Sequence, residues 1–429
     1  MQSAKVVVIG SSYSSAAVFD SLEKLLTKVR QPIDLILIAE RPYYFIKSLF
    51  SQFIANNCSL NSLCFSFRNI LLLRPGVSFL QSEVVDININ EKIVKTSSGF
   101  INYDYLILAP ELDRDDFGEI FSDIDCFRIN TLLDVISLKK QINECVDKAS
   151  RENNIDLKNK LLTFSVIGAG KNGIETALSI YDFVFNLTKK QYPDLKLSQI
   201  KINLTDEKNV IPFQKDPFYN AKIFYILNKK KINLCLNSKV TRIDADRLIL
   251  NNKDELYTST IIFSGNYKYS SLINNLPLKK DDNHLGCVDL YSKADGLENV
   301  FIIGESSKCL DLNESNSHSL HFFYKQADTC ANNLIARINN NILKPLRNID
   351  ELDFLSLGMN NSLTEIKGVY LDSIFVWFLY RLVNIRSVIG WKNKIKAFLG
   401  FLLCVFGLSD DETIYLHEIS KQKKRIVMK

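Results

Sequence analysis

The chain has 429 residues, of which 46% are hydrophobic, enough to form the cores of two or three domains. Its formal net charge of +5 is small, and its basic residues are spread along the chain, which argues against a nucleic-acid-binding protein. Nine cysteines without paired spacing are typical of a reducing compartment, and no cluster has the spacing of a metal site. No basic segment precedes the first apolar run, so a secretory signal peptide is not expected.

The first part of the chain predicts a βαβ unit. Lys5–Ile9 is a continuous β-branched run, as in a central parallel strand that is buried on both faces. Ala16–Leu25 is predicted to be a helix and Ile33–Ala39 a second strand. Together these segments give the strand, helix and strand of a parallel α/β sheet.

The turn after the first strand is a candidate phosphate-binding turn. In dinucleotide-binding folds this turn places a pyrophosphate at the helix N-terminus, and an acid at the end of the second strand binds a ribose. Gly10 and Glu40 occupy these two places, but Ser12 and Ser15 stand where the motif has its second and third glycines. An ordinary βαβ unit with a polar turn is the alternative interpretation.

A second unit carries the complete glycine motif. Phe164–Ile167 is predicted to be a strand, Thr176–Leu187 a helix and Ile200–Leu204 the next strand. The glycines between the first strand and the helix are Gly168, Gly170 and Gly173. In this order they permit a tight turn, let the backbone approach a phosphate and let the helix pack on the strand. The pattern predicts a nucleotide site.

Acidic residues accompany this second motif. Asp206 and Glu207 follow the last strand of the unit and would repel a 2′-phosphate, which favours NADH over NADPH, although the basic Lys208 is next to them. Glu175 follows the third glycine by two residues, near the start of the predicted helix. One interpretation of Glu175 is a helix N-terminal acid stabilised by the macrodipole.

Three further strands complete the pattern. They are predicted at Tyr103–Ala109, at Ile261–Gly265, which ends in a candidate cofactor-binding glycine, and at Asn299–Ile303. The last one is followed by Gly304 and Glu305. This order of elements resembles the two-dinucleotide flavoproteins, in which an NAD(P)H domain is inserted into an FAD domain. The resemblance implies that Gly304 and Glu305 stand where that family has a Gly-Asp pair whose acid binds the ribityl chain of FAD.

Within that family the chain resembles the type II NADH dehydrogenases, the single-subunit NADH:quinone oxidoreductases, along nearly its whole length. The matching segments are Arg41–Gln52, the insertion at Gln191–Leu195 and the C-terminal stretch Val388–Leu403. The resemblance implies FAD as cofactor, NADH as electron donor and a quinone as acceptor. It also implies a peripheral protein on the cytoplasmic face of the inner or cell membrane, of a kind that often forms homodimers.

Departures from the family lie on the flavin side. Ser12 and Ser15 replace glycines, Glu305 replaces an aspartate, and Ala109–Glu111 stands where the family has Ala-Thr-Gly. Because the Cβ of Ser12 should crowd the pyrophosphate, we expect FAD to be bound non-covalently and more weakly than is usual.

The candidate catalytic residues come from two predicted helices. Of the glutamines that the family carries on the helix after its Gly-Asp strand, only Gln326 is kept. His321 and Lys325 are four residues apart on that helix and share one face, where they could donate protons to a quinone or to the flavin edge. A solvated polar face is the alternative. In the resembling enzymes, an acid at the place of Glu175 helps to position the nicotinamide and to relay a proton.

The expected fold class is α/β, with two Rossmann-like dinucleotide-binding domains and a helical tail. Residues 1–112 and 266–345 are predicted to form the FAD domain, and residues 113–265 the NAD(P)H domain inserted in it. Residues 346–429 are predicted to form a C-terminal region that docks on the membrane.

This tail has short apolar runs with basic residues between them. The runs Ser373–Tyr380 and Ala397–Phe406 have about ten residues or fewer, well short of the roughly 20 that a spanning helix needs. Trp391 lies between the runs together with the basic residues Arg381, Arg386, Lys392, Lys394 and Lys396. Such helices are typical of the membrane interface. The alternatives are a helical pair packed on the FAD domain and a dimer interface. Deletion of the residues after Gly368 is expected to distinguish membrane docking from these alternatives.

The sequence thus predicts an FAD-dependent oxidoreductase that passes electrons from NADH to a quinone at the membrane surface without pumping protons. Two alternatives stay open. One is a flavoprotein reductase with another acceptor, because the quinone glutamines are not kept. The other is a non-catalytic descendant that binds a nucleotide, because the flavin motifs are eroded.

Overall fold

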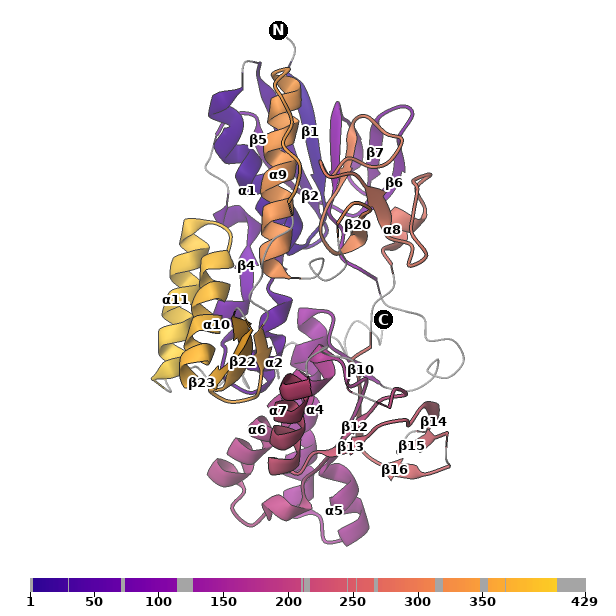
Figure 1. Cartoon of the computed structure of the whole chain (residues 1–429), viewed down its shortest axis with the longest axis vertical. Helices are drawn as coiled ribbons and strands as arrows, with labels where there is room; N and C mark the ends of the chain where they lie inside the picture. The colour runs from indigo at the N-terminus through magenta and orange to yellow at the C-terminus, as the bar shows by residue number, and fades with distance from the viewer. Residues whose placement is uncertain are drawn as a thin grey trace.

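The computed structural model describes residues 3–29, 31–70, 74–113, 126–209, 211, 217–244, 246–251, 253–265, 269–312, 319–347, 354–366 and 368–406. These residues form two α/β bodies, one above the other in Figure 1. The upper body combines the first and the later parts of the chain, and the lower body contains the middle part. The two last helices lie to the side of the upper body, near the place where the bodies meet.

The first body is built on a five-stranded parallel sheet in the order β19-β9-β1-β2-β5. Its strands are β1 (Ala4–Ile9), β2 (Ile33–Ala39), β5 (Val77–Gln81), β9 (Tyr105–Leu108) and β19 (Val300–Ile302). Val6 and Val8 of β1 lie in the core shared with α1 (Tyr13–Leu25) and α9 (Leu320–Ile338), and Val7 lies in a separate core on the other face. Burial on both faces explains the uninterrupted apolar run of β1.

Smaller elements surround this sheet. An antiparallel sheet of β6 (Val84–Asn88), β7 (Ile93–Thr96) and β8 (Gly99–Asn102) contributes to the second of these cores. The other elements are β3 (Tyr43–Phe45), α2 (Phe50–Ile54), α3 (Leu60–Leu63), β4 (Cys64–Ser66), α8 (Ser271–Asn274), β18 (Gly286–Val288) and β20 (Ser307–Cys309).

The second body has a five-stranded parallel sheet of its own, in the order β10-β17-β11-β12-β13. The strands are β10 (Phe127–Arg128), β11 (Thr163–Ile167), β12 (Lys201–Thr205), β13 (Asn233–Cys235) and β17 (Thr260–Phe263). Its helices are α4 (Leu132–Arg151), α5 (Ile155–Leu161), α6 (Lys171–Gln191) and α7 (Pro217–Lys229). A three-stranded sheet of β14 (Val240–Asp244), β15 (Arg247–Leu250) and β16 (Glu255–Tyr257) completes it.

The second sheet is inserted in the first. The chain leaves the first sheet after β9 and returns to it only with β19, which pairs in parallel with β9. All strands of the second sheet lie between these two in the sequence. The predicted fold class, with one Rossmann-like unit inserted in another, is confirmed.

Both helices that follow the glycine turns begin earlier than the apolar pattern predicts. α1 begins at Tyr13 and not at Ala16, because the Oγ of Ser12 caps it by accepting a hydrogen bond from Ser15 N at 3.1 Å. α6 begins at Lys171 and not at Thr176. Polar residues in a first helical turn carry no apolar periodicity. A side-chain cap marks the start of α1, whereas α6 starts after Gly170 without a side-chain hydrogen bond.

The C-terminal region forms a small sheet followed by two helices. Its elements are β21 (Phe354–Ser356), β22 (Ser362–Ile366), β23 (Val369–Ser373), α10 (Ile374–Ser387) and α11 (Trp391–Val405). Among the residues that the structure describes, no helix is both long and apolar enough to cross a membrane. Residues 407–429 of the predicted tail lie outside the described residues.

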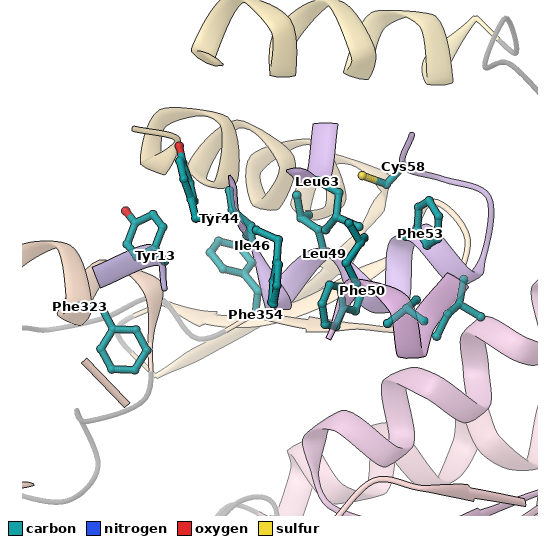
Figure 2. Packing of buried hydrophobic residues seen from close by; sticks show 14 of the residues in the cluster. Tyr13, Tyr44, Ile46, Leu49, Phe50, Phe53, Cys58, Leu63, Phe323 and Phe354 are labelled. Carbon is teal, nitrogen blue, oxygen red and sulfur yellow. The ribbon is translucent and has the colours of Figure 1, made fainter. Parts of the chain in front are cut away.

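Two tyrosines of the first body fix the turn between α10 and α11. The hydroxyl of Tyr13 donates to the carbonyl oxygen of Ser387 at 2.8 Å. The hydroxyl of Tyr44 donates to the carbonyl oxygen of Ile389 and accepts from its amide nitrogen, both at 2.9 Å. Figure 2 shows the two rings in the buried cluster, close to the C-terminal helices. The aromatic segment after β2 therefore has a structural task, which is to hold the tail.

The helices of the tail each bury one face against the first body. In α10, Trp377 Nε1 donates to Gln52 Oε1 at 3.0 Å. In α11, Gly400 lies so close to α3 that an added Cβ would be 2.2 Å from Ser62 Oγ. The inner faces of α10 and α11 therefore pack on the first body, which is one of the alternatives predicted from the sequence. Truncation after Gly368 would remove part of the core, so surface substitutions test membrane docking more sharply.

We expect Tyr44→Phe to lower the free energy of unfolding by about 1–3 kcal/mol, because the amide nitrogen of Ile389 would lose its hydrogen-bond partner in a buried place, while its carbonyl oxygen would keep only the bond from Asn393 Nδ2. The urea midpoint, followed by circular dichroism, measures the change. Tyr225→Phe, at an exposed ring, is the matched control and should keep the wild-type midpoint. Equal midpoints for the two variants would show that the hydroxyl of Tyr44 does not hold the tail.

Candidate functional site

The first candidate site lies where β1 ends between β2 and β9. Ligands of open α/β sheets bind outside the carboxyl ends of the strands at a point where the strand order reverses, as it does here. Gly10 follows β1 with a φ of +138°, and an added Cβ would lie 2.2 Å from the carbonyl oxygen of Ala109. Only glycine fits this approach. Glu40 follows β2 at the same edge and is exposed.

The two serines of this turn use their hydroxyls inside the protein. Ser12 Oγ donates to the carbonyl oxygen of Ala109 at 2.7 Å, besides capping α1. Ser15 is fully buried, and its Oγ donates to the carbonyl oxygen of Ser12 at 2.7 Å. The hydroxyl groups that replace the glycines therefore stabilise the turn itself.

The end of β19 brings Gly304 and Glu305 to this edge in the short 3-10 helix η6 (Gly304–Ser306). An added Cβ on Gly304 would lie 2.5 Å from Ser14 Oγ in the first turn of α1, so the two turns touch. Gln326 of α9 is buried, with its Oε1 accepting from Gly304 N at 2.8 Å and its Nε2 donating to Ser307 Oγ at 2.9 Å. Both ends of this amide are engaged in holding the Gly304 turn.

Two ion pairs connect segments that meet at the same edge. Arg41 pairs with Glu111 at 2.6 Å, and Lys47 pairs with Glu305 at 2.6 Å. Burial raises the pKa of Glu111, against the opposing effects of Lys47 and Arg41. Burial would lower the pKa of Lys47, but Glu305 and Glu111 outweigh it, so the pKa is raised. Lys47 and Glu111 therefore each interact with the other three charges.

Sequence reasoning missed three members of this cluster as site residues. Arg41 and Glu111 each follow a strand that flanks β1, and Lys47 lies in the aromatic segment. Charged residues directly after the strands of a parallel sheet were the signal that could have identified Arg41 and Glu111.

His321 and Lys325 are exposed near the start of α9. The pKa of His321 is lowered, first by partial burial and then by the cations of Lys325 and Arg386. His321 is therefore neutral at pH 7. Because Arg386 belongs to α10, the polar face of α9 lies beside the tail.

The second candidate site lies at the end of β11, where the second sheet also reverses its strand order. Gly168 has a φ of +100°, and an added Cβ on Gly173 would lie 1.8 Å from the carbonyl oxygen of Gly168. Gly170 differs, because a Cβ there would meet no atom within 4 Å. Gly265 follows β17, and its amide nitrogen lies 3.6 Å from the place of a Cβ on Gly168. The glycines thus meet at one edge.

The acids of the second unit have different surroundings. The carboxylate of Asp206 accepts hydrogen bonds from Ala169 N at 2.6 Å and from Lys208 N at 2.9 Å, so it braces the glycine turn. Glu207 is exposed beside it. Glu175 is buried in α6, and its Oε1 accepts from Ser356 N of β21 at 2.8 Å. Glu175 therefore ties the second body to the C-terminal sheet.

Both edges have the features that a dinucleotide needs. At the second edge, the open space beside Gly170 lets a phosphate approach the backbone at the N-terminus of α6. At the first edge, the backbone of Arg41 is bonded to the turn before α1, Lys47 pairs with Glu305 after β19, and Glu40 is exposed. Among the described residues, no group of three or more His, Cys, Asp or Glu side chains could hold a metal ion.

Curated relatives match most of the chain. It is 21% identical over 409 residues to the type II NADH:quinone oxidoreductase of Mycobacterium tuberculosis, covering 92% of this chain and 87% of that protein. It is also 21% identical over 324 residues to a probable NADH dehydrogenase of Dictyostelium discoideum, covering 74% of this chain and 70% of that protein. The chain is a divergent relative of the type II NADH:quinone oxidoreductases. No protein-family profile matches it.

Solved structures with a similar fold include an NDH2 and a sulfide:quinone oxidoreductase. NDH2 from Plasmodium falciparum, solved in complex with NADH, superposes with a TM-score of 0.80 at 18% identity, covering 95% of this chain and 99% of that one. The sulfide:quinone oxidoreductase of Aquifex aeolicus superposes with a TM-score of 0.71 at 15% identity, covering 95% and 96%. At such identities the likeness shows that the fold is shared.

None of the nine cysteines, all of which lie in the described residues, forms a disulfide. Cys58 and Cys64, which are six positions apart in the sequence, are therefore not joined to each other. Burial raises the pKa of Cys64 to about 11 and that of Cys126 to about 12. These thiols stay protonated at neutral pH and are therefore poor nucleophiles.

We expect Gly170→Val to abolish NADH binding without unfolding the protein, because its side chain would enter the open space where a phosphate must approach. Titration with NADH, followed by its fluorescence, measures the affinity. Gly173→Val is the contrasting variant, which should be destabilised outright because it meets the carbonyl oxygen of Gly168. If a folded Gly170→Val protein binds NADH as tightly as wild type, the second edge is not the NADH site.

Proposed function

We propose that the protein is an FAD-dependent oxidoreductase that passes electrons from NADH to a quinone at a membrane surface, without pumping protons. The observation that carries this proposal is the presence of two dinucleotide-type edges in one chain, beside a helical pair with an apolar outer face. Kinship with the type II NADH:quinone oxidoreductases supports the choice of donor and acceptor.

The first edge is the proposed FAD site, within a domain formed by residues 1–112 and 266–345. The turn from Gly10 through Ser12 and Ser15 would hold the pyrophosphate at the N-terminus of α1, and Glu40 a ribose. Gly304 and Glu305 would lie along the ribityl chain, as the resemblance implies. When bound, FAD supplies the acceptor for hydride and the donor of electrons to the quinone.

The second edge is the proposed NADH site, within the inserted residues 113–265. Its glycines Gly168, Gly170, Gly173 and Gly265 let the backbone approach the phosphates. Glu207 is the exposed acid available to a ribose, whereas Asp206 positions the turn. Glu175 fixes the C-terminal sheet near this unit and is the candidate for positioning the nicotinamide.

The proposed quinone side lies on α9 beside the tail. His321 is neutral and exposed together with Lys325, so both have hydrogens to donate to a quinone oxygen. Gln326 is a positioning residue, because it is engaged with Gly304 and Ser307.

The tail is proposed to lie in the membrane interface. Its exposed apolar residues include Phe375, Leu382, Trp391, Phe398, Leu399 and Leu403. The basic residues Arg386, Lys392, Lys394 and Lys396 are also exposed. Arg381 is not part of this surface, because it is buried with its guanidinium 5.3 Å from the ring of Phe401. Exposed apolar and basic side chains on one helical pair favour an anionic lipid surface.

The visible spectrum of the purified protein tests the central proposal. After reconstitution with FAD we expect flavin absorption bands that bleach when NADH is added and return when a soluble quinone is supplied. Bands that bleach without reoxidation by quinone would favour a reductase with another acceptor. A protein that binds NADH but takes up no flavin would instead be a nucleotide-binding descendant.

Docking on the membrane is tested by replacing exposed leucines. We expect Leu399→Glu with Leu403→Glu to lower co-sedimentation with anionic phospholipid vesicles at least about tenfold, because each buried leucine is worth roughly 1.5–3 kcal/mol. Oxidation of NADH with a soluble dye should be unchanged. Val85→Glu with Phe100→Glu, at exposed apolar residues of the antiparallel sheet, is the matched control. Equal sedimentation of the two double variants would overturn the assignment of this face.

A further inference from the structure

The ion pair of Arg41 and Glu111 connects the segment after β2 with the segment after β9 at the first candidate site. β2 and β9 are the two neighbours of β1, and they pair with it so that Ile9 lies opposite Ile38 and Leu108. Arg41 follows β2 and Glu111 follows β9, and their side chains meet at 2.6 Å. The pair therefore joins the two flanking strands over the end of β1, where the turn begins at Gly10.

A second contact places Arg41 at the turn itself. Its amide nitrogen donates to Ser11 Oγ at 3.2 Å, and Ser11 lies between the glycine and the N-cap of α1. Its guanidinium also lies 4.9 Å from the centre of the Phe45 ring. The backbone of Arg41 is thus fixed at the turn, while its side chain lies between the Phe45 ring and the carboxylate of Glu111.

Both partners are partly removed from water. Their side chains are 23% and 17% exposed, so the attraction is screened less than at an open surface. Lys47 also interacts with Glu111, while being paired with Glu305. If Arg41 turned to another anion, Lys47 would remain as a cation near Glu111, so the exchange does not leave a bare carboxylate.

We propose that Glu111 is an internal anion that competes with the phosphates of the dinucleotide for Arg41 and thereby sets the affinity for FAD. The proposal rests on the proposed function, because it assumes that FAD binds at this edge. A guanidinium forms charge-assisted hydrogen bonds with carboxylate and with phosphate alike, so one can replace the other. The competition would weaken FAD binding through a charge, whereas the expectation from the sequence is weakening by the Cβ of Ser12.

The experiment measures FAD affinity of the full chain freed of flavin, from the quenching of FAD fluorescence. We expect Glu111→Gln to bind FAD about tenfold more tightly and Arg41→Gln about tenfold more weakly, the size of one charge-assisted hydrogen bond. In the Arg41→Gln background, Glu111→Gln should bring no further gain, because nothing is left to compete for. Glu91→Gln, an exposed carboxylate, makes the same change in net charge and should leave the affinity unchanged.

The outcomes separate the two proposals. Equal affinity of wild type and Glu111→Gln overturns the competition while leaving the FAD site in place. An equal gain from Glu111→Gln with and without Arg41 also overturns it, since the effect would then be general repulsion of phosphate. Failure of wild type and every variant to bind FAD, with NADH binding intact, overturns the proposed function as well. Glu111→Ala, checked for its urea midpoint, provides a second variant if the glutamine perturbs folding.

Discussion

The close approach of the chain at the end of β1 is the constraint on which the first body depends. Gly10 lies against the carbonyl of Ala109 in a space that no Cβ could share, and this contact brings the start of α1 next to the end of β9. The Oγ of Ser12 then bonds to the same carbonyl, and Gly304 packs on the first turn of α1. Three segments far apart in the sequence meet at one edge because Gly10 and Gly304 lack side chains.

The two edges have diverged unequally. The second keeps all three motif glycines, with the space beside Gly170 open. The first has serines and two ion pairs that connect Arg41 with Glu111 and Lys47 with Glu305. The serine hydroxyls stabilise their own turn. The charges at the first edge would instead act on any anion that binds there.

The C-terminal region connects both bodies and also presents the proposed membrane face. Glu175 of α6 binds the backbone of Ser356, and Tyr44 binds the backbone of Ile389. Buried hydrogen bonds thus connect the C-terminal region to each of the two bodies. The outer faces of the helices remain available, because only their inner faces contact the first body.

Sequence alone determined the strands, the glycine turns, the insertion of one unit in the other and the amphipathic tail. These features depend on local periodicity and on the backbone freedom of single residues, which a sequence displays directly. Tertiary structure decided the partners of the polar side chains: Gln326 supports Gly304, Arg381 is buried, and Arg41 meets Glu111. Such partners come from strands and helices distant in the sequence, and their meeting depends on how the sheets order their strands, which no local pattern encodes.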